Sequence, residues 1–182
     1  ADLLERDKHR FPNLACMKIA GYYKELGYDI ELLMNYDELN ALSANISDYI
    51  LNLVARKGGH LSSNLGSIDA TISICRNFDL LKDKIIFDVG HQTYAYKILT
   101  GRNISSIRER GGISGFQKMT ESIYDHYEAG HSSTSISSAY GMAVARDLNK
   151  ENYHVVAFIG DAALANGLAL EGLHLIGKRK HK

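Results

Sequence analysis

Three of the eight histidines directly follow a glycine, and these are His60, His91 and His131. All three fall at predicted boundaries between a regular element and a loop, where side chains can face a cleft. An imidazole in such a place can donate a hydrogen bond to a phosphate or transfer a proton to a substrate oxygen. Three unrelated surface histidines would give the same pattern. A zinc site is disfavoured, because no pair has metal-ligand spacing and no cysteine is nearby.

A carboxylate, Asp161, follows Gly160 directly after a predicted buried strand. Between a strand and a helix, such a side chain can hold a hard cation such as Mg²⁺, which would neutralise a bound phosphate. The same aspartate could equally serve as a helix N-cap. Both interpretations stay open on these residues alone.

A run of four hydroxyl residues, 132–135, follows Gly130 and His131. At the start of a predicted helix, these residues would supply hydroxyl donors beside free backbone N–H groups, which together could cradle a diphosphate. An ordinary N-capping run would look the same. Considered together, the three loops favour a phosphorylated ligand held by metal, histidine and helix termini.

The elements that must position these residues follow from hydrophobic periodicity. Two short apolar runs, residues 84–89 and 153–159, are each followed by a glycine and predict buried strands. Residues 60–64 are predicted as a loop, and residues 102–128 as a long excursion with one helical turn near residues 105–110. Helices are predicted over residues 13–26, 37–56, 65–78, 91–99, 133–148 and 163–176.

Alternating strands, glycines and helices predict an α/β fold with a mostly parallel sheet flanked by helices. Ligands of such sheets bind at the carboxyl ends of the strands, where the three loops are expected. Two strands alone would leave apolar surface uncovered, because parallel sheets are buried on both faces. We therefore expect hidden strands or a missing partner surface.

Composition narrows the class of protein. The 182 residues suit one domain, and 21 basic against 21 acidic residues give no net charge, which disfavours nucleic-acid binding. No apolar run has the length of a membrane span, and the charged N-terminus is unlike a secretory signal. The two cysteines form no CxxC pair and predict reduced thiols in a cytoplasmic protein.

A set of motifs occurs in order along residues 35–177, and its collinearity makes an accidental match unlikely. The motifs are GGHL at 58–61, FDVGHQ at 87–92, KILTGR at 97–102, GGISGF at 111–116, ES at 121–122, GHSSTS at 130–135, GMAVAR at 141–146 and GD at 160–161. Through these motifs the chain closely resembles the N-terminal domain of the 1-deoxy-D-xylulose-5-phosphate synthases, thiamine-diphosphate enzymes related to transketolase.

The resemblance implies a thiamine-diphosphate-binding fold and a transferase that condenses pyruvate with glyceraldehyde 3-phosphate, with loss of CO₂. It also implies thiamine diphosphate and Mg²⁺ as cofactors, a role in isoprenoid and thiamine precursor synthesis, and a homodimer. By motif position, Asp161 would bind Mg²⁺ and His60 would assist proton transfers. The cofactor-binding residues would be His91, Gly130, His131, Ser132, Ala162 and Ala163.

The chain departs from the family pattern at three places, one of which is Asn166-Gly167, where the family has two glycines. Ala162 stands where the family has glycine, and its methyl group would be strained if the site needs a positive φ. The family also supplies an asparagine to the metal well downstream of the aspartate, and no asparagine follows Asn166. Residues 1–34 match the family only loosely, and we expect them to be an extension. Because the family's pyrimidine-binding and C-terminal domains are also missing, we expect residues 35–182 to be a truncated diphosphate-binding domain.

Three functions remain open from the sequence. The first is an incomplete half-site of such a synthase, inactive alone because the domain that activates the cofactor is absent. The second is one subunit of a split enzyme. The third is a non-catalytic binding or interaction module that kept the fold.

Overall fold

The computed structural model describes residues 36–178 of the chain. Within this range the chain forms two compact units. The first contains residues 36–79 and 94–113, and the second contains residues 80–93 and 114–178. The second unit combines a small parallel sheet with helices, which confirms the predicted α/β class.

The first unit is helical. Apolar side chains spaced by three and four residues along α3, such as Ile46, Ile50 and Leu53, are buried. The long helix ends where the sequence predicts, because Gly58 takes a φ of +73°, a left-handed conformation that favours glycine. The elements of this unit are α3 (Tyr36–Lys57), α4 (Leu61–Leu65), α5 (Ile68–Asn77), α6 (Tyr94–Leu99) and the 3₁₀ turn η1 (Ile104–Ser106).

Residues 60–64 were expected as a loop, and this prediction was wrong, because they open the short helix α4. Asn64 is fully buried there, and its amide nitrogen donates to the carbonyl oxygen of His60 at 2.6 Å. Gly66 N–H donates to Ser62 O and closes the turn. Polar residues build this helix through local hydrogen bonds, so no apolar period marked it.

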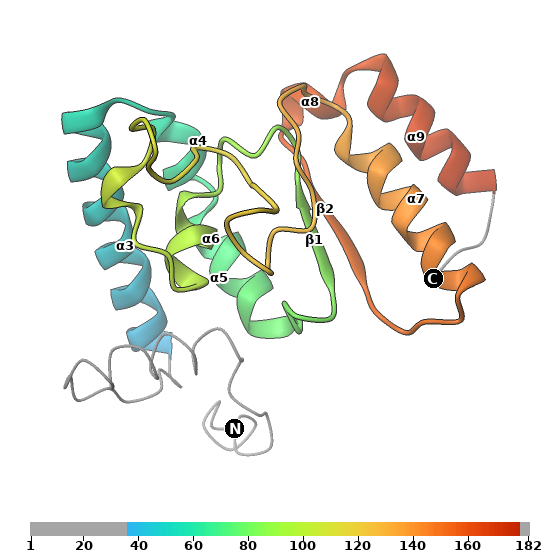
Figure 1. The fold of residues 1–182 in the computed structure, drawn as a ribbon, viewed down its shortest axis with the longest axis horizontal. Coiled ribbons are helices and arrows are strands. Elements are labelled where there is room, and N and C mark those ends of the chain that lie inside the picture. Colours follow the sequence, from blue (N-terminus) through green and yellow to red (C-terminus); the bar gives the residue numbers. More distant parts are fainter. Residues whose placement is uncertain (1–35, 179–182) are drawn as a thin grey trace. The chain divides into compact units, whose positions relative to one another are not determined.

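The second unit holds the sheet (Figure 1). Strands β1 (Lys84–Phe87) and β2 (Val155–Phe158) pair in parallel, with Lys84 opposite Val155 and Phe87 opposite Phe158. Helix α7 (Ser135–Leu148) packs on the strands, and α9 (Gly167–Lys178) packs on α7. A Cβ atom on Gly172 would lie 2.9 Å from Ile136, so glycine allows the two helices to approach closely.

The predicted last helix, residues 163–176, is in fact two helices. A short helix α8 (Asp161–Leu164) precedes α9, and the side chain of Asn166 accepts a hydrogen bond from Leu168 N–H at 3.0 Å. This local cap starts the second helix. The other helices and both strands match their predictions within a few residues, and the predicted helix over residues 13–26 lies outside the described range.

The second unit exposes much apolar surface, as the sparse sheet led us to expect. All four residues of β2 are only partly buried. Leucines on α8 and α9 are 38–53% exposed, and these are Leu164, Leu168, Leu170, Leu173 and Leu175. No helix within residues 36–178 has the length and apolar character needed to cross a lipid bilayer.

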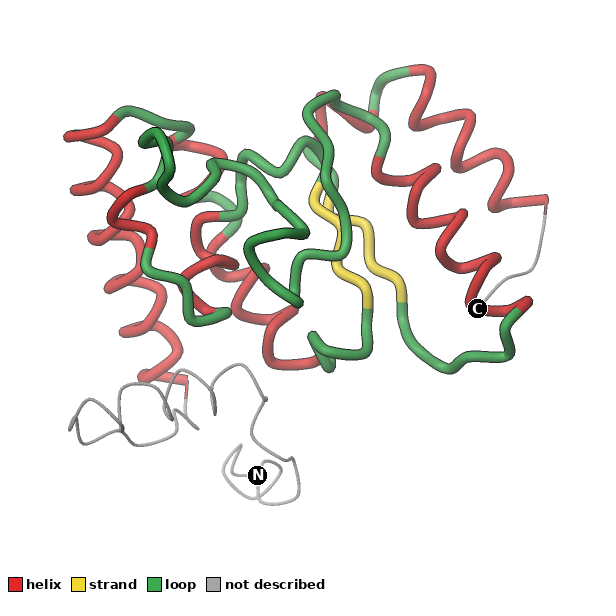
Figure 2. The backbone as a smooth tube through the Cα atoms, viewed as in Figure 1, coloured by secondary structure: helices red, strands yellow, loops and turns green. Residues whose placement is uncertain are grey.

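The long loop of residues 114–134 has almost no regular structure (Figure 2) but many side-chain anchors. Glu121, Asp125 and Glu128 accept hydrogen bonds from the backbone N–H groups of residues 114, 118 and 119. Gln117 is buried and pairs with β1 in the manner of a third strand. Its side-chain oxygen accepts from Phe87 N–H at 3.0 Å, and its nitrogen donates to Ile85 O at 3.3 Å.

We expect Gln117→Leu to lower the free energy of unfolding by about 1–3 kcal/mol, because it leaves buried backbone groups of β1 without partners. Urea denaturation measures this change. Gln117→Asn is the matched control, because it keeps an uncharged amide that can both accept and donate, and it should lose less. An unchanged midpoint for the leucine variant would show that Gln117 does not complete the strand.

Candidate functional site

The carboxyl ends of β1 and β2 lie at the same edge of the sheet. Asp88 N–H donates to Phe158 O at 2.8 Å, so the strand pairing extends one residue beyond β1. Residues 88–92 therefore leave the sheet beside residues 159–163. This places the predicted histidine loop next to the predicted metal-binding loop.

The third predicted loop, residues 130–135, joins the other two through buried hydrogen bonds. The Asp88 carboxylate accepts from Ser133 N–H at 2.8 Å and from Ser135 N–H at 3.1 Å. The hydroxyl of Ser133 donates to Ala163 O at 2.8 Å. The second unit thus brings together the three segments that the sequence predicted separately.

A strained turn follows β1. Val89 has a φ of +61°, and Gly90 N–H donates to Asp88 O at 2.7 Å, which closes a three-residue turn of the rare, strained type. Gly90 has a φ of +94°, and a Cβ atom there would lie 3.1 Å from Gln117 N. Only glycine suits this position. His91 follows the turn directly and is partly buried.

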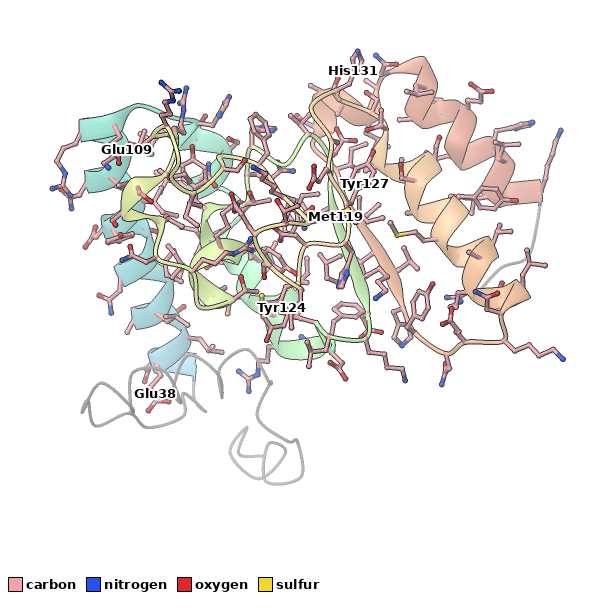
Figure 3. All side chains as sticks on the ribbon, in the orientation of Figure 1. Glu38, Glu109, Met119, Tyr124, Tyr127 and His131 are labelled. Atoms are coloured by element: carbon pink, nitrogen blue, oxygen red, sulfur yellow. The ribbon has the colours of Figure 1, made fainter. Side chains whose placement is uncertain are left out.

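His131 is exposed, and its side chain points away from the strands (Figure 3). Its Nδ1 lies 2.8 Å from Ser132 O, a carbonyl that only accepts, so Nδ1 carries the proton. In the neutral ring Nε2 is then free of a proton. Tyr127 braces this loop, because its hydroxyl donates to Thr134 Oγ1 at 2.9 Å and accepts from Ser138 Oγ at 3.0 Å.

The backbone donors at the start of α7 are not free, contrary to the expectation from sequence. Ser133 and Ser135 N–H both go to the Asp88 carboxylate. The hydroxyl of Ser135 is buried and has no hydrogen-bond partner among the described residues. The loop therefore offers hydroxyl and imidazole groups, rather than these two N–H groups, to a ligand.

Asp161 and Ala162 are exposed at the start of α8, and Ala163 is partly buried. Within residues 36–178 no three histidine, cysteine or acidic side chains gather into a metal-binding group. Mg²⁺ commonly uses one or two carboxylates together with phosphate oxygens and water. The single carboxylate of Asp161 therefore fits a cation that arrives with a diphosphate, and not a cation held by protein ligands alone.

His60 lies in the first unit, exposed at the N-cap of α4. Asn64 ties its backbone to α6, since the amide nitrogen of Asn64 donates to His60 O and its oxygen accepts from Tyr94 N–H at 2.9 Å. Gly59 takes a φ of +145°, and a Cβ atom there would lie 2.8 Å from the Tyr94 hydroxyl. The catalytic role of His60 stays a prediction.

Sequence reasoning missed Asp88, Gln117 and Asn64. Asp88 was counted as part of an apolar strand, although a charged residue is rarely fully buried unless it is paired. That negative charge within the run was the available signal. Gln117 and Asn64 stood in polar stretches without period, and nothing in their spacing marked them.

The comparisons with known proteins agree with the motifs. A family model described as 1-deoxy-D-xylulose-5-phosphate synthase matches residues 28–182. The chain belongs to this family. This confirms the resemblance drawn from the sequence motifs.

Several curated relatives carry the same name, 1-deoxy-D-xylulose-5-phosphate synthase. The relative from Clostridium tetani is 54% identical over 162 residues, which cover 88% of this chain and 26% of the relative. The relative from Clostridium acetobutylicum is 53% identical over 149 residues, which cover 81% of this chain and 24% of the relative. The relative from Syntrophus aciditrophicus is 51% identical over 154 residues, which cover 84% of this chain and 24% of the relative. The chain spans about a quarter of the length of these relatives.

His126 supplies a pH-sensitive anchor for the loop that leads to this region. Its Nε2 lies 3.2 Å from Leu80 O. Burial lowers the pKa of His126 below the usual 6.5, and the positive charge of Lys84 lowers it further. The Leu80 carbonyl and the charge of Asp125 act in the opposite direction, as does the backbone of Asp83. The neutral ring is therefore favoured in the folded chain.

We expect the folded chain to lose stability as the pH falls below 6.5, because the unfolded chain then binds a proton that folded His126 resists. His126→Gln should make the free energy of unfolding depend less steeply on pH in this window. Urea denaturation at several pH values between about 5 and 7 measures the slope. Equal slopes for both chains would remove His126 as the cause.

Proposed function

We propose that the second unit binds the diphosphate of thiamine diphosphate together with Mg²⁺, as part of an enzyme that condenses pyruvate with glyceraldehyde 3-phosphate. One observation carries this proposal. Three segments that the family motifs single out meet at the carboxyl ends of β1 and β2, tied by Asp88 and Ser133. This is the edge where parallel α/β sheets bind ligands.

Each residue has a distinct task in this proposal. The Asp161 carboxylate ligates the cation, whose charge offsets the diphosphate. The hydroxyl of Ser132 donates a hydrogen bond to a phosphate oxygen, the imidazole of His131 contacts the ligand beside it, and the exposed backbone at Gly130 lets the ligand approach. The remaining contacts come from His91, Ala162 and Ala163.

When bound, thiamine diphosphate supplies the carbanion chemistry of carbon–carbon bond cleavage and formation. The residues of this chain bind and orient it, and His60 holds or moves a proton at the substrate oxygen. The described residues make only part of such a site. We therefore expect the 182 residues to bind the cofactor without turnover on their own. A homodimeric, cytoplasmic enzyme is part of the same proposal.

A second candidate is a non-catalytic module, or one subunit of a split enzyme, that kept the fold. Ala162 favours the module, because the family has glycine at this position. Ala162 does not take a positive φ, however, and lies within α8 with an ordinary helical backbone. The strain that the sequence raised as a possibility is therefore absent, and only the bulk of the methyl group remains.

Calorimetric titration of the chain with thiamine diphosphate, with and without Mg²⁺, tests the proposal. We expect binding that Mg²⁺ strengthens, and we expect Asp161→Ala to abolish this Mg²⁺ dependence, because it removes the carboxylate ligand. Glu171→Ala is a matched control, since Glu171 is an exposed carboxylate on α9, outside the three loops of the site.

Unchanged Mg²⁺ dependence in Asp161→Ala would refute the metal assignment. Folded chain that binds no thiamine diphosphate under either condition would favour the non-catalytic module. Binding by the unsubstituted chain, followed by turnover only after addition of a second polypeptide, would favour the split enzyme.

We expect Ala162→Gly to change thiamine diphosphate affinity by no more than about twofold, because Ala162 already has a relaxed helical backbone. Its melting temperature should fall slightly, since glycine inside a helix costs about 1 kcal/mol relative to alanine. The same calorimetric titration and a thermal melt measure both effects. Affinity increased tenfold or more would mean that the methyl group obstructs the ligand.

A further inference from the structure

Asp88 is fixed by its backbone on both sides. Its N–H donates to Phe158 O at 2.8 Å, a backbone hydrogen bond that extends the pairing of β1 and β2. Its carbonyl oxygen accepts from Gly90 N–H at 2.7 Å and from the side-chain nitrogen of Gln92 at 3.1 Å. The side chain of Asp88 therefore projects from a position that the sheet and the turn define together.

The carboxylate of Asp88 is almost fully buried, with 1% of the residue exposed. A buried charge is unfavourable unless hydrogen bonds and opposite charge compensate it. Here the two oxygens accept from Ser133 N–H and Ser135 N–H, and the positive end of the α7 dipole lies beside them. Each charge-assisted bond is stronger than one between neutral groups.

Ser133 links Asp88 to α8 through two hydrogen bonds of its own. It has a φ of +72°, which is uncommon for a residue other than glycine, and it is completely buried. Its N–H is held by Asp88 and its hydroxyl is held by Ala163 O. The loop of residues 130–135 is thus fastened to the end of β1 and to the helix that Asp161 begins.

We infer that Asp88 is a positioning residue, whose carboxylate fixes the loop of residues 130–135 so that His131, Ser132 and Asp161 face one ligand. The inference rests on the proposed function for the identity of that ligand. In this role the carboxylate of Asp88, and not a phosphate of the ligand, accepts the hydrogen bonds of Ser133 N–H and Ser135 N–H at the start of α7.

Asp88→Asn tests this role. The amide of asparagine keeps one acceptor but turns an NH₂ group toward one of the two backbone N–H groups, and it carries no charge. We expect the amide hydrogens of Ser133 and Ser135 to exchange with solvent about ten to a hundred times faster, measured by NMR.

Asp125→Asn is the matched control. Asp125 is also buried, at 3% exposed, and its carboxylate accepts one backbone N–H, from Lys118 at 2.9 Å. It should lose stability without changing exchange at Ser133 and Ser135. Ser133→Ala is a milder second variant, which keeps both bonds to Asp88 and removes only the bond to Ala163.

Thiamine diphosphate affinity in the presence of Mg²⁺ separates positioning from general stability. We expect Asp88→Asn to weaken binding by about tenfold or more, Asp125→Asn by less than about twofold, and Ser133→Ala by an intermediate factor. Equal weakening in Asp88→Asn and Asp125→Asn would overturn the positioning role, and so would unchanged exchange at Ser133 and Ser135 in Asp88→Asn.

The two measurements also distinguish this inference from the proposed function. Failure of the unsubstituted chain to bind thiamine diphosphate would overturn the proposed function. The amide exchange rates of Ser133 and Ser135 are measured without cofactor. They would therefore still support or overturn the role of Asp88 in fixing the loop of residues 130–135.

Discussion

A single buried carboxylate constrains the second unit. Asp88 ends β1, and its charge would be unfavourable in the interior without the two N–H groups of residues 133 and 135. The start of α7 must therefore lie against the end of β1. Because Ser133 also bonds Ala163, the position of α8 follows from the same requirement. One desolvated charge thus sets the geometry of all three loops.

Sequence periodicity predicted the elements whose apolar residues repeat. The long helix α3 was found because its buried side chains repeat every three or four residues, and both strands were found because each is a short, continuous apolar run. Helix α4 and the break between α8 and α9 were missed. Polar side chains, Asn64 in the first case and Asn166 in the second, determine these features through hydrogen bonds to nearby backbone.

The candidate site could be predicted in part. Glycine followed by a polar residue marked the loops at residues 90–91, 130–131 and 160–161, and parallel pairing explains why the first and last of these lie at one edge. The sequence did not reveal that Asp88 uses the donors at the start of α7. A carboxylate in an apolar run has no detectable partner until the fold places one beside it.

Of the four non-glycine residues with positive φ in the described part of the chain, two lie in the same region. Val89 and Ser133 both take positive φ values, and each is adjacent to or bonded to Asp88. Such conformations persist only where surrounding contacts determine them, and they are frequent near binding sites. Their position agrees with a site at this sheet edge, and it is independent of the family comparison.

The most direct test of the account is to map amide chemical shifts by NMR as thiamine diphosphate and Mg²⁺ are added to the chain. The account predicts that, within the second unit, the largest changes fall in residues 88–92, 130–135 and 160–163, and that they depend on Mg²⁺. Changes concentrated elsewhere in that unit, or none at saturating ligand, would contradict it.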